Sequence, residues 1–196
     1  LDLAGVRLTD VDLEEVGLAG VRGQGAALAG CSLTGCVLRG ARLGGVRMED
    51  VVVRGSDCVE MALLDAVLNR VRFEESPCSN VRFDRASLVG VDFLASDLFG
   101  ARFDGSVLVR AGFGNRRLGN AVLTRASFAG AVLVDVDLSG ADLSKASFAG
   151  ALLVRVRLDD ANLDGSDFNG ARIVGGSWAR THLEGPTRDA FAQARV

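Results

Sequence analysis

The sequence is poor in the residues that carry most enzyme chemistry. Its 196 residues include one histidine (His182), one lysine (Lys145) and no tyrosine. It contains no GxSxG nucleophile turn, phosphate-binding P-loop or glycine-rich dinucleotide motif. Acidic pairs such as Glu14–Glu15 and Asp159–Asp160 are more typical of a solvated convex surface than of a glycosidase, because a glycosidase holds its two carboxylates in a cleft. We therefore expect no catalytic residue and no cofactor.

Long hydrophobic runs are also missing, and we expect no signal peptide. Hydrophobic residues make up 48% of the chain, yet no segment approaches the roughly 18 consecutive apolar residues of a membrane-spanning helix. We expect a cytoplasmic protein that makes no contact with a membrane.

What the sequence has instead is an apolar residue at every fifth position. Of the 37 positions at this spacing from Leu3 to Leu183, only Gly23 lacks an apolar side chain. A period of five fits neither an α-helix, where it advances about 140° beyond a full turn, nor a straight strand, where an odd period alternates between the two faces. It fits a chain that bends once in each unit, so that every central side chain points inward.

Glycines mark the expected bends. Eighteen of the 25 glycines lie two residues after a central position, and Asn80, Asn115 and Asn120 occupy the same place. Gly and Asn tolerate the positive φ of the third residue in a type II turn. The residue two places before each central position is small, as in Val6 and Ala26, and is expected to fill the rest of a crowded interior.

The cysteines follow the same period. Cys31, Cys36, Cys58 and Cys78 all occupy inward positions. Stacked Cys58 and Cys78 would have parallel Cβ vectors that hold their Cβ atoms slightly too far apart for a disulfide. We expect buried free thiols, which suit a reducing cytoplasm, and no metal site, because the spacing is that of the repeat and not that of zinc ligands.

The number of units in one coil follows from an internal duplication. Residues 126–138 read ASFAGAVLVDVDL and residues 146–158 read ASFAGALLVRVRL, twenty residues later. The central phenylalanines are also spaced by twenty, and their rings are expected to stack between neighbouring coils. Four units per coil predict an all-β fold, a quadrilateral parallel β-helix of about nine coils, with no insertion that shifts the frame.

The units resemble those of a known family. ADLSK (141–145), ANLDG (161–165) and VDLSG (136–140) are similar to the A(D/N)LXX motif of the pentapeptide repeat family. The resemblance covers residues 1–185 and implies a right-handed β-helix, but the motif itself contains no chemistry. Residues 186–196 are expected to form a C-terminal tail or a short capping helix, with Thr187 or Asp189 as its N-cap and with Phe191 covering the last coil below Trp178.

Two positions break the pattern. Gly23 leaves a central position empty, so the second coil is expected to be loose. Arg116 falls on an inward position within the glycine-rich stretch 112–120. Because a buried unpaired Arg is costly, we expect a bulge or local distortion there.

Folding the chain at twenty residues per turn sorts the outward side chains onto four walls. We number these walls by the units of Leu3 (first wall), Leu8 (second wall), Leu13 (third wall) and Leu18 (fourth wall). The third wall then collects an apolar cluster, and contiguous exposed apolar residues usually mark a protein contact; the alternative is that strands simply favour Val. A homodimer is the simplest contact. The candidate residues are Leu94, Val132, Val134, Leu152, Val154 and Val174.

Acidic residues suggest a second function. The resemblance implies that a member of the family can mimic DNA, bind DNA gyrase or another type II topoisomerase, and confer quinolone or gyrase-poison resistance. The candidate residues are Glu74, Glu75, Asp92, Asp97, Asp137, Asp159 and Asp160. Against this stand a net charge of only −3, with 22 basic residues, and the absence of a projecting loop in the predicted fold.

Two functions therefore remain open after the sequence. One is a non-catalytic interaction scaffold or oligomerising rod with an unknown protein partner, and the other is the DNA mimic. Direct binding of nucleic acid is not expected, because the sequence has no basic stripe with interleaved aromatic residues.

Overall fold

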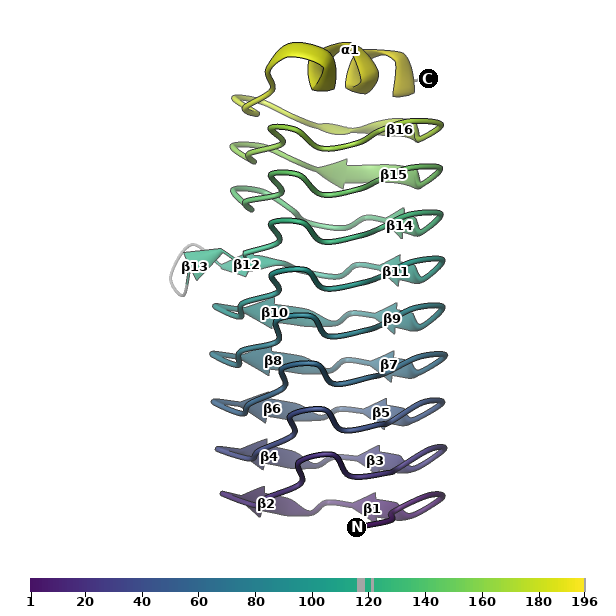
Figure 1. The fold of residues 1–196 in the computed structure, drawn as a ribbon, viewed down its shortest axis with the longest axis vertical. Coiled ribbons are helices and arrows are strands. Elements are labelled where there is room, and N and C mark those ends of the chain that lie inside the picture. Colours follow the sequence, from purple (N-terminus) through teal and green to yellow (C-terminus); the bar gives the residue numbers. More distant parts are fainter. Residues whose placement is uncertain (116–118, 121, 196) are drawn as a thin grey trace.

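The computed structural model is a solenoid whose turns stack along one axis, with a helix across its C-terminal end (Figure 1). It describes residues 1–115, 119–120 and 122–195. A nine-stranded parallel sheet forms the second wall and a five-stranded parallel sheet forms the third wall; about eight turns separate the first and last of the nine strands. Isolated parallel bridges connect the turns along the first and fourth walls.

The strands are short because the chain bends in every unit. The second-wall sheet consists of β1 (Arg7–Thr9), β3 (Ala27–Ala29), β5 (Arg47–Glu49), β7 (Val67–Asn69), β9 (Ser87–Val89), β11 (Val107–Val109), β14 (Val132–Val134), β15 (Leu152–Arg157) and β16 (Arg172–Ser177). The third-wall sheet consists of β2 (Asp12–Glu14), β4 (Ser32–Thr34), β6 (Val52–Arg54), β8 (Arg72–Glu74) and β10 (Asp92–Leu94). β15 and β16 are longer because they continue from the second wall around the corner.

The five-residue pattern predicts the interior correctly. The described central side chains form one core that runs the length of the solenoid, together with the small inward residues between them. All eighteen corner glycines have positive φ. Seventeen residues other than glycine adopt the same conformation, most of them Asp, Glu or Arg. The bend is therefore imposed by the stacking of the turns, and glycine only lowers its cost.

One turn is 25 residues long, and the prediction of a uniform coil of twenty residues is wrong. Leu88 pairs with Leu108, twenty residues later, but Leu108 pairs with Leu133, 25 residues later. The extra residues belong to an antiparallel hairpin of β12 (Gly114–Asn115) and β13 (Gly119–Asn120), which projects sideways from the solenoid (Figure 1). The expected absence of a projecting loop is also wrong. Arg116, where a distortion was expected, lies outside the described residues.

The insertion was hidden because it is one repeat long. Five extra residues leave the five-residue apolar frame intact, but they move every later unit back by one wall relative to a strict coil of twenty. Phe128 shows the consequence: its ring stacks on Phe103, 25 residues earlier, with centroids 4.9 Å apart. The predicted stacking of the aromatic rings is confirmed, and across this turn the partner differs from the one that strict counting gives.

The C-terminal helix covers the last turn. α1 (Gly185–Ala194) follows Glu184, which is the N-cap residue and makes no side-chain capping bond, so the prediction that Thr187 or Asp189 caps the helix is wrong. Phe191 is buried and contacts the rings of Phe168 and Trp178 at centroid distances of 5.2 and 5.9 Å. These contacts confirm that Phe191 covers the end of the core.

The four cysteines are free and buried, as predicted. The neighbouring Cys58 thiol, together with burial, raises the pKa of Cys78, which keeps this thiol protonated. Within the part of the chain that the structure describes, no helix is long and apolar enough to span a membrane.

Candidate functional site

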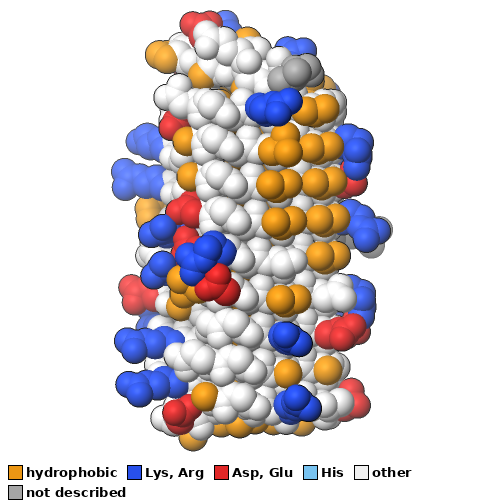
Figure 2. Space-filling view, turned by 90° about the vertical axis from the view of Figure 1, so that its right-hand side faces the viewer, with side chains coloured by type: hydrophobic (Ala, Val, Ile, Leu, Met, Phe, Trp, Pro, Cys, Tyr) orange, Lys and Arg blue, Asp and Glu red, His pale blue; other side chains and the backbone are white. Residues whose placement is uncertain are grey.

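Two rows of aliphatic side chains cover the C-terminal half of the second wall (Figure 2). Parallel in-register pairing places equivalent residues of successive strands above one another, so that residues of one type form a continuous row along the axis. We call the eight residues of these rows the aliphatic patch. One row consists of Val107, Val132 and Leu152, and the other of Val89, Val109, Val134, Val154 and Val174.

The patch is flat, exposed and bounded. Val107 and Val174 are 42% and 39% exposed, and the other six side chains are half-buried because they pack against one another. Strands β9 to β16 at about 4.8 Å spacing make the patch about 19 Å long. Arg172 borders it toward the helix. In the other direction Ser87, Asn69, Arg47 and Glu49 interrupt the rows, with the exposed Val67 between them.

The sequence predicted most of this patch but placed it on the wrong wall. The insertion moves Val132, Val134, Leu152, Val154 and Val174 from the third wall to the second. Leu94 lies before the insertion and stays on the third wall, in β10, where it pairs with Glu74 of β8. The prediction that Leu94 belongs to the patch is therefore wrong.

The sequence analysis did not predict three residues of the patch. Val89, Val107 and Val109 lie on strands that precede the insertion, so strict counting placed them on a different wall from Val132 and Val134. A signal for their true position exists in the sequence: VLV occurs at 107–109 and again at 132–134, 25 residues apart.

The insertion also changes the wall assigned to some of the acidic candidates, and most of them now share one wall. Bridges from Asp92 to Gly112, from Gly112 to Asp137 and from Asp137 to Arg157 place Asp137 on the third wall, where counting had put it on the fourth. Six of the seven candidates now follow the third wall and its corners: Glu74, Glu75, Asp92, Asp137, Asp159 and Asp160. Asp97 lies on the fourth wall.

Arginines from neighbouring turns neutralise much of this acidic row. Arg54 contacts Glu74 at 2.5 Å, Arg157 contacts Asp137 at 2.7 Å and Arg180 contacts Asp160 at 2.6 Å. At least one partner of each pair is exposed to solvent, which screens the attraction, so the pairs contribute little to stability. Their main effect is on charge: three of the six acidic candidates on this wall have an arginine partner.

Of the three remaining candidates on this wall, Asp159 interacts with neutral groups and Asp92 lies partly buried, whereas Glu75 is exposed. The Ser177 hydroxyl and the Ala179 amide both donate to Asp159 at 2.6 Å and lower its pKa. Partial burial raises the pKa of Asp92, an effect that the charge of Arg72 opposes. The Asp159 carboxylate therefore takes part in the hydrogen bonds that join neighbouring turns of this wall.

The family model for pentapeptide repeats matches this chain in eight copies, within residues 18–55, 76–115, 106–144 and 141–175. These segments include most of the solenoid. The chain belongs to the pentapeptide repeat family. No curated protein matches it.

Solved pentapeptide repeat structures are similar to the chain at low identity. HetL, a protein involved in heterocyst differentiation regulation in the cyanobacterium Nostoc sp. strain PCC 7120, is 21% identical over 86% of this chain and 87% of its own, with a TM-score of 0.33. Full-length QnrB1, a plasmid-mediated fluoroquinolone resistance protein, is 16% identical over 95% and 98% of the two chains, also with a TM-score of 0.33. A thylakoid-lumen protein from Arabidopsis thaliana is 32% identical but covers only 51% of this chain and 56% of its own, with a TM-score of 0.22. Likenesses this weak carry no function over to this pentapeptide repeat protein.

Among the described residues, no group of three or more His, Cys, Asp or Glu side chains is placed to hold a metal ion. His182 is exposed on the fourth wall and its Nε2 lies 3.0 Å from Asp164. The aliphatic patch is the surface feature that differs most from the surrounding charged walls.

Proposed function

We propose that this protein is a non-catalytic binding rod that associates with a second copy of itself through the aliphatic patch. The observation that carries the proposal is the contiguous run of eight aliphatic side chains on one flat wall. Scattered exposed valines need no explanation, but a continuous apolar patch of this kind usually marks a protein contact.

A second copy suits the patch because both surfaces would have the same repeat. The side chains within each row are spaced by the strand separation, so a partner with the same spacing matches them. A two-fold axis across the patch brings each row against its equivalent. Closing this face would not bury an isolated charge at the corner beside β14 and β15, because Asp135 and Arg155 already pair with each other at 2.6 Å. Desolvation of an unpaired charge, the usual penalty at such an interface, is thereby reduced.

Charges placed in one of the two rows should separate the copies. We expect sedimentation equilibrium to give twice the chain mass of 20.5 kDa for the wild-type protein and the single-chain mass for the double variant Val134→Asp/Val154→Asp. The expected cause is that four unpaired carboxylates would lie in one apolar interface. Leu94→Asp is the matched control, since it adds a charge at a half-buried aliphatic position on another wall and should leave the mass doubled.

The masses of the wild-type protein and of the double variant each test the proposal. Circular dichroism must show that both variants keep the β-solenoid. A single-chain mass for the wild-type protein, or a doubled mass for the double variant, would contradict the proposal.

A second candidate function rests on the acids that share the third wall. Their common wall favours a DNA mimic that binds DNA gyrase, and the arginine partners oppose it, because a competitor for a DNA-binding surface needs a strong negative field. We expect no inhibition of gyrase supercoiling at micromolar protein and no protection against a quinolone. Inhibition that is lost in Glu75→Gln/Asp92→Gln would instead favour the DNA mimic over the self-associating rod.

We also propose that the protein works in the cytoplasm. The four buried thiols support this setting, since they are free and a reducing compartment keeps them so.

A further inference from the structure

Two thiols meet inside the fourth wall. Cys58 and Cys78 are the central residues of successive turns, and both are completely buried. The turns pair in register: the Cys58 amide donates to the Pro77 carbonyl at 2.8 Å, and the Cys78 amide donates to the Asp97 carbonyl at 2.7 Å. The two side chains therefore leave the wall in the same direction, and their thiols form a hydrogen bond with each other. We call these two residues the thiol pair.

The other two cysteines have different partners. The Cys31 thiol donates to the Leu8 carbonyl at 3.6 Å, and the Cys36 thiol donates to the Leu13 carbonyl at 3.4 Å. Both occupy the small inward positions beside a corner, where a backbone carbonyl of the preceding turn is within reach. The thiol pair occupies central positions instead and places one sulfur against another.

The spacing of the turns suits a metal ion between these two sulfurs. Equivalent residues of neighbouring turns lie about 4.8 Å apart, and parallel Cβ vectors at this spacing are slightly too far apart for a disulfide. A bond between a metal ion and a thiolate is about 2.3 Å long, so two such bonds in a straight line span about 4.6 Å. The register that opposes a disulfide therefore matches a linear arrangement of sulfur, metal and sulfur.

The surroundings of the thiol pair limit the charge of the metal ion. Leu38 and Leu98, the central residues of the turns on either side, are buried. The hydroxyls of the neighbouring Ser56 and Ser76 already donate to backbone carbonyls. An uncompensated charge is costly in such a core. Two thiolates and a divalent ion form a neutral complex, whereas two thiolates and a monovalent ion keep one negative charge.

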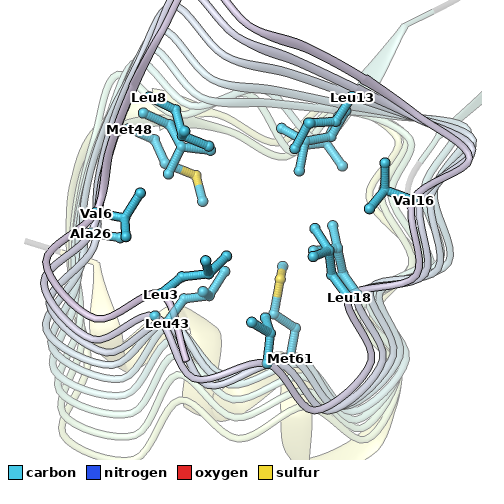
Figure 3. Close-up of a pocket in the computed structure, with 16 residues that line it drawn as sticks. Leu3, Val6, Leu8, Leu13, Val16, Leu18, Ala26, Leu43, Met48 and Met61 are labelled. Atoms are coloured by element: carbon cyan, nitrogen blue, oxygen red, sulfur yellow. The ribbon is translucent and has the colours of Figure 1, made fainter. Parts of the chain in front are cut away.

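The core beside the thiol pair also has room to adjust. An unfilled space of about 180 Å³, lined only by apolar side chains and Gly23, extends to Leu38 and Met61. Met61 follows Cys58 by three residues, and its thioether points into the interior (Figure 3). This space allows the side chains next to Cys58 to shift when a metal ion enters.

We propose that Cys58 and Cys78 bind one soft divalent metal ion of the Hg(II) type between them, as a linear and neutral bis-thiolate complex. Thiolates select soft metal ions, and Hg(II) readily bonds two of them in a line. On binding, each thiol releases its proton to solvent, so one Hg(II) ion replaces two protons and the charge of the core stays at zero. The site lies in the interior and is independent of the aliphatic patch.

Zinc serves as the comparison ion. A structural zinc site is tetrahedral and needs four ligands. Within the part of the chain that the structure describes, no third His, Cys, Asp or Glu side chain joins the thiol pair. We therefore expect Zn(II) to be lost under conditions in which Hg(II) is retained.

Native mass spectrometry after incubation with equimolar HgCl₂ and a wash with excess glutathione tests the site. The wild-type protein should retain one Hg(II) ion per chain and lose two protons. Cys58→Ala and Cys78→Ala should each retain none. The double variant Cys31→Ala/Cys36→Ala is the matched control, because it removes two buried thiols at corner positions and should retain the ion. If Cys58→Ala does not fold by circular dichroism, Cys58→Val, which fills more of the same volume, replaces it.

Thermal unfolding shows whether the ion binds the folded chain. A ligand that binds only the folded state raises the unfolding temperature, so Hg(II) should raise the Tm of the wild-type protein and of the corner double variant, and should not raise that of Cys58→Ala. Hg(II) retained with a lowered Tm, retention in the folded Cys58→Ala protein, or loss from the corner double variant would overturn the proposal. Retention of Zn(II) would refute the linear geometry.

Discussion

Phe103→Ala should lower the free energy of unfolding by about 3–5 kcal/mol, the usual loss when a buried Phe is truncated in a core that cannot collapse. The Phe103 ring is fully buried. It stacks on Phe83 at 5.0 Å and on Phe128 at 4.9 Å, and it also contacts Phe93 and Phe113 edge to face. Removing it leaves a cavity and four incomplete aromatic pairs in the turn that carries the insertion.

Phe99→Ala is the matched control for this change. Phe99 is only four residues away but points outward from the fourth wall, where it is 40% exposed and lies 6.0 Å from the Arg125 guanidinium. Its truncation should cost less than about 1 kcal/mol. Urea unfolding of both variants measures the difference. Equal losses would contradict the interpretation that the inward stack, and not the aromatic residue itself, stabilises the solenoid.

The interior of this protein could be predicted from the sequence because it depends on a single rule. A central residue such as Leu153 is inward whatever its neighbours are, since each five-residue unit contains its own bend. The corner of each unit is equally local: Gly140 and Lys145 both adopt positive φ two residues after a central leucine. No long-range information is needed for either feature.

The wall on which an outward residue lies could not be predicted by the same rule. It depends on how many units the chain has wound before that residue. Val134 and Leu94 fall on one wall if every turn has twenty residues, and on different walls if one turn has 25. The five-residue pattern is identical in both cases. Only an alignment of neighbouring turns with one another distinguishes the two cases. The correct alignment places Phe128 against Phe103 and not against Leu108. The candidate patch was thus mostly correct in its members and wrong in its location.

The prediction of the N-cap residue of the C-terminal helix was wrong for a different reason. Thr187 and Asp189 have the side chains that usually cap a helix, but Pro186 occupies one of the first two helical positions. Its fixed φ favours the first turn of a helix, so the helix begins before either candidate. Glu184 becomes the N-cap by position and makes no capping bond.

Two deletions that both keep the five-residue frame should differ in their effect on self-association: one should keep the dimer and the other should abolish it. Removing residues 116–120 converts the long turn into one of twenty residues, leaves every wall assignment unchanged and should give a dimer with a stability within about 1 kcal/mol of wild type, since shortening a surface loop changes the loop-closure entropy only slightly. Removing residues 136–140 takes one unit from a regular turn instead. Every later unit then moves back by one wall.

The second deletion should produce a folded monomer. Leu152, Val154 and Val174 would leave the second wall, and Arg157 and Asp159 would take the places beside Val132 and Val134. Phe148 would also leave Phe128, on which it now stacks at 5.0 Å, so the free energy of unfolding should fall by about 1 kcal/mol or more. Sedimentation equilibrium and urea unfolding measure both effects. A dimer of unchanged stability after removal of residues 136–140 would mean that the register between turns does not determine the binding wall, because in that variant the apolar frame is intact and only the register has changed.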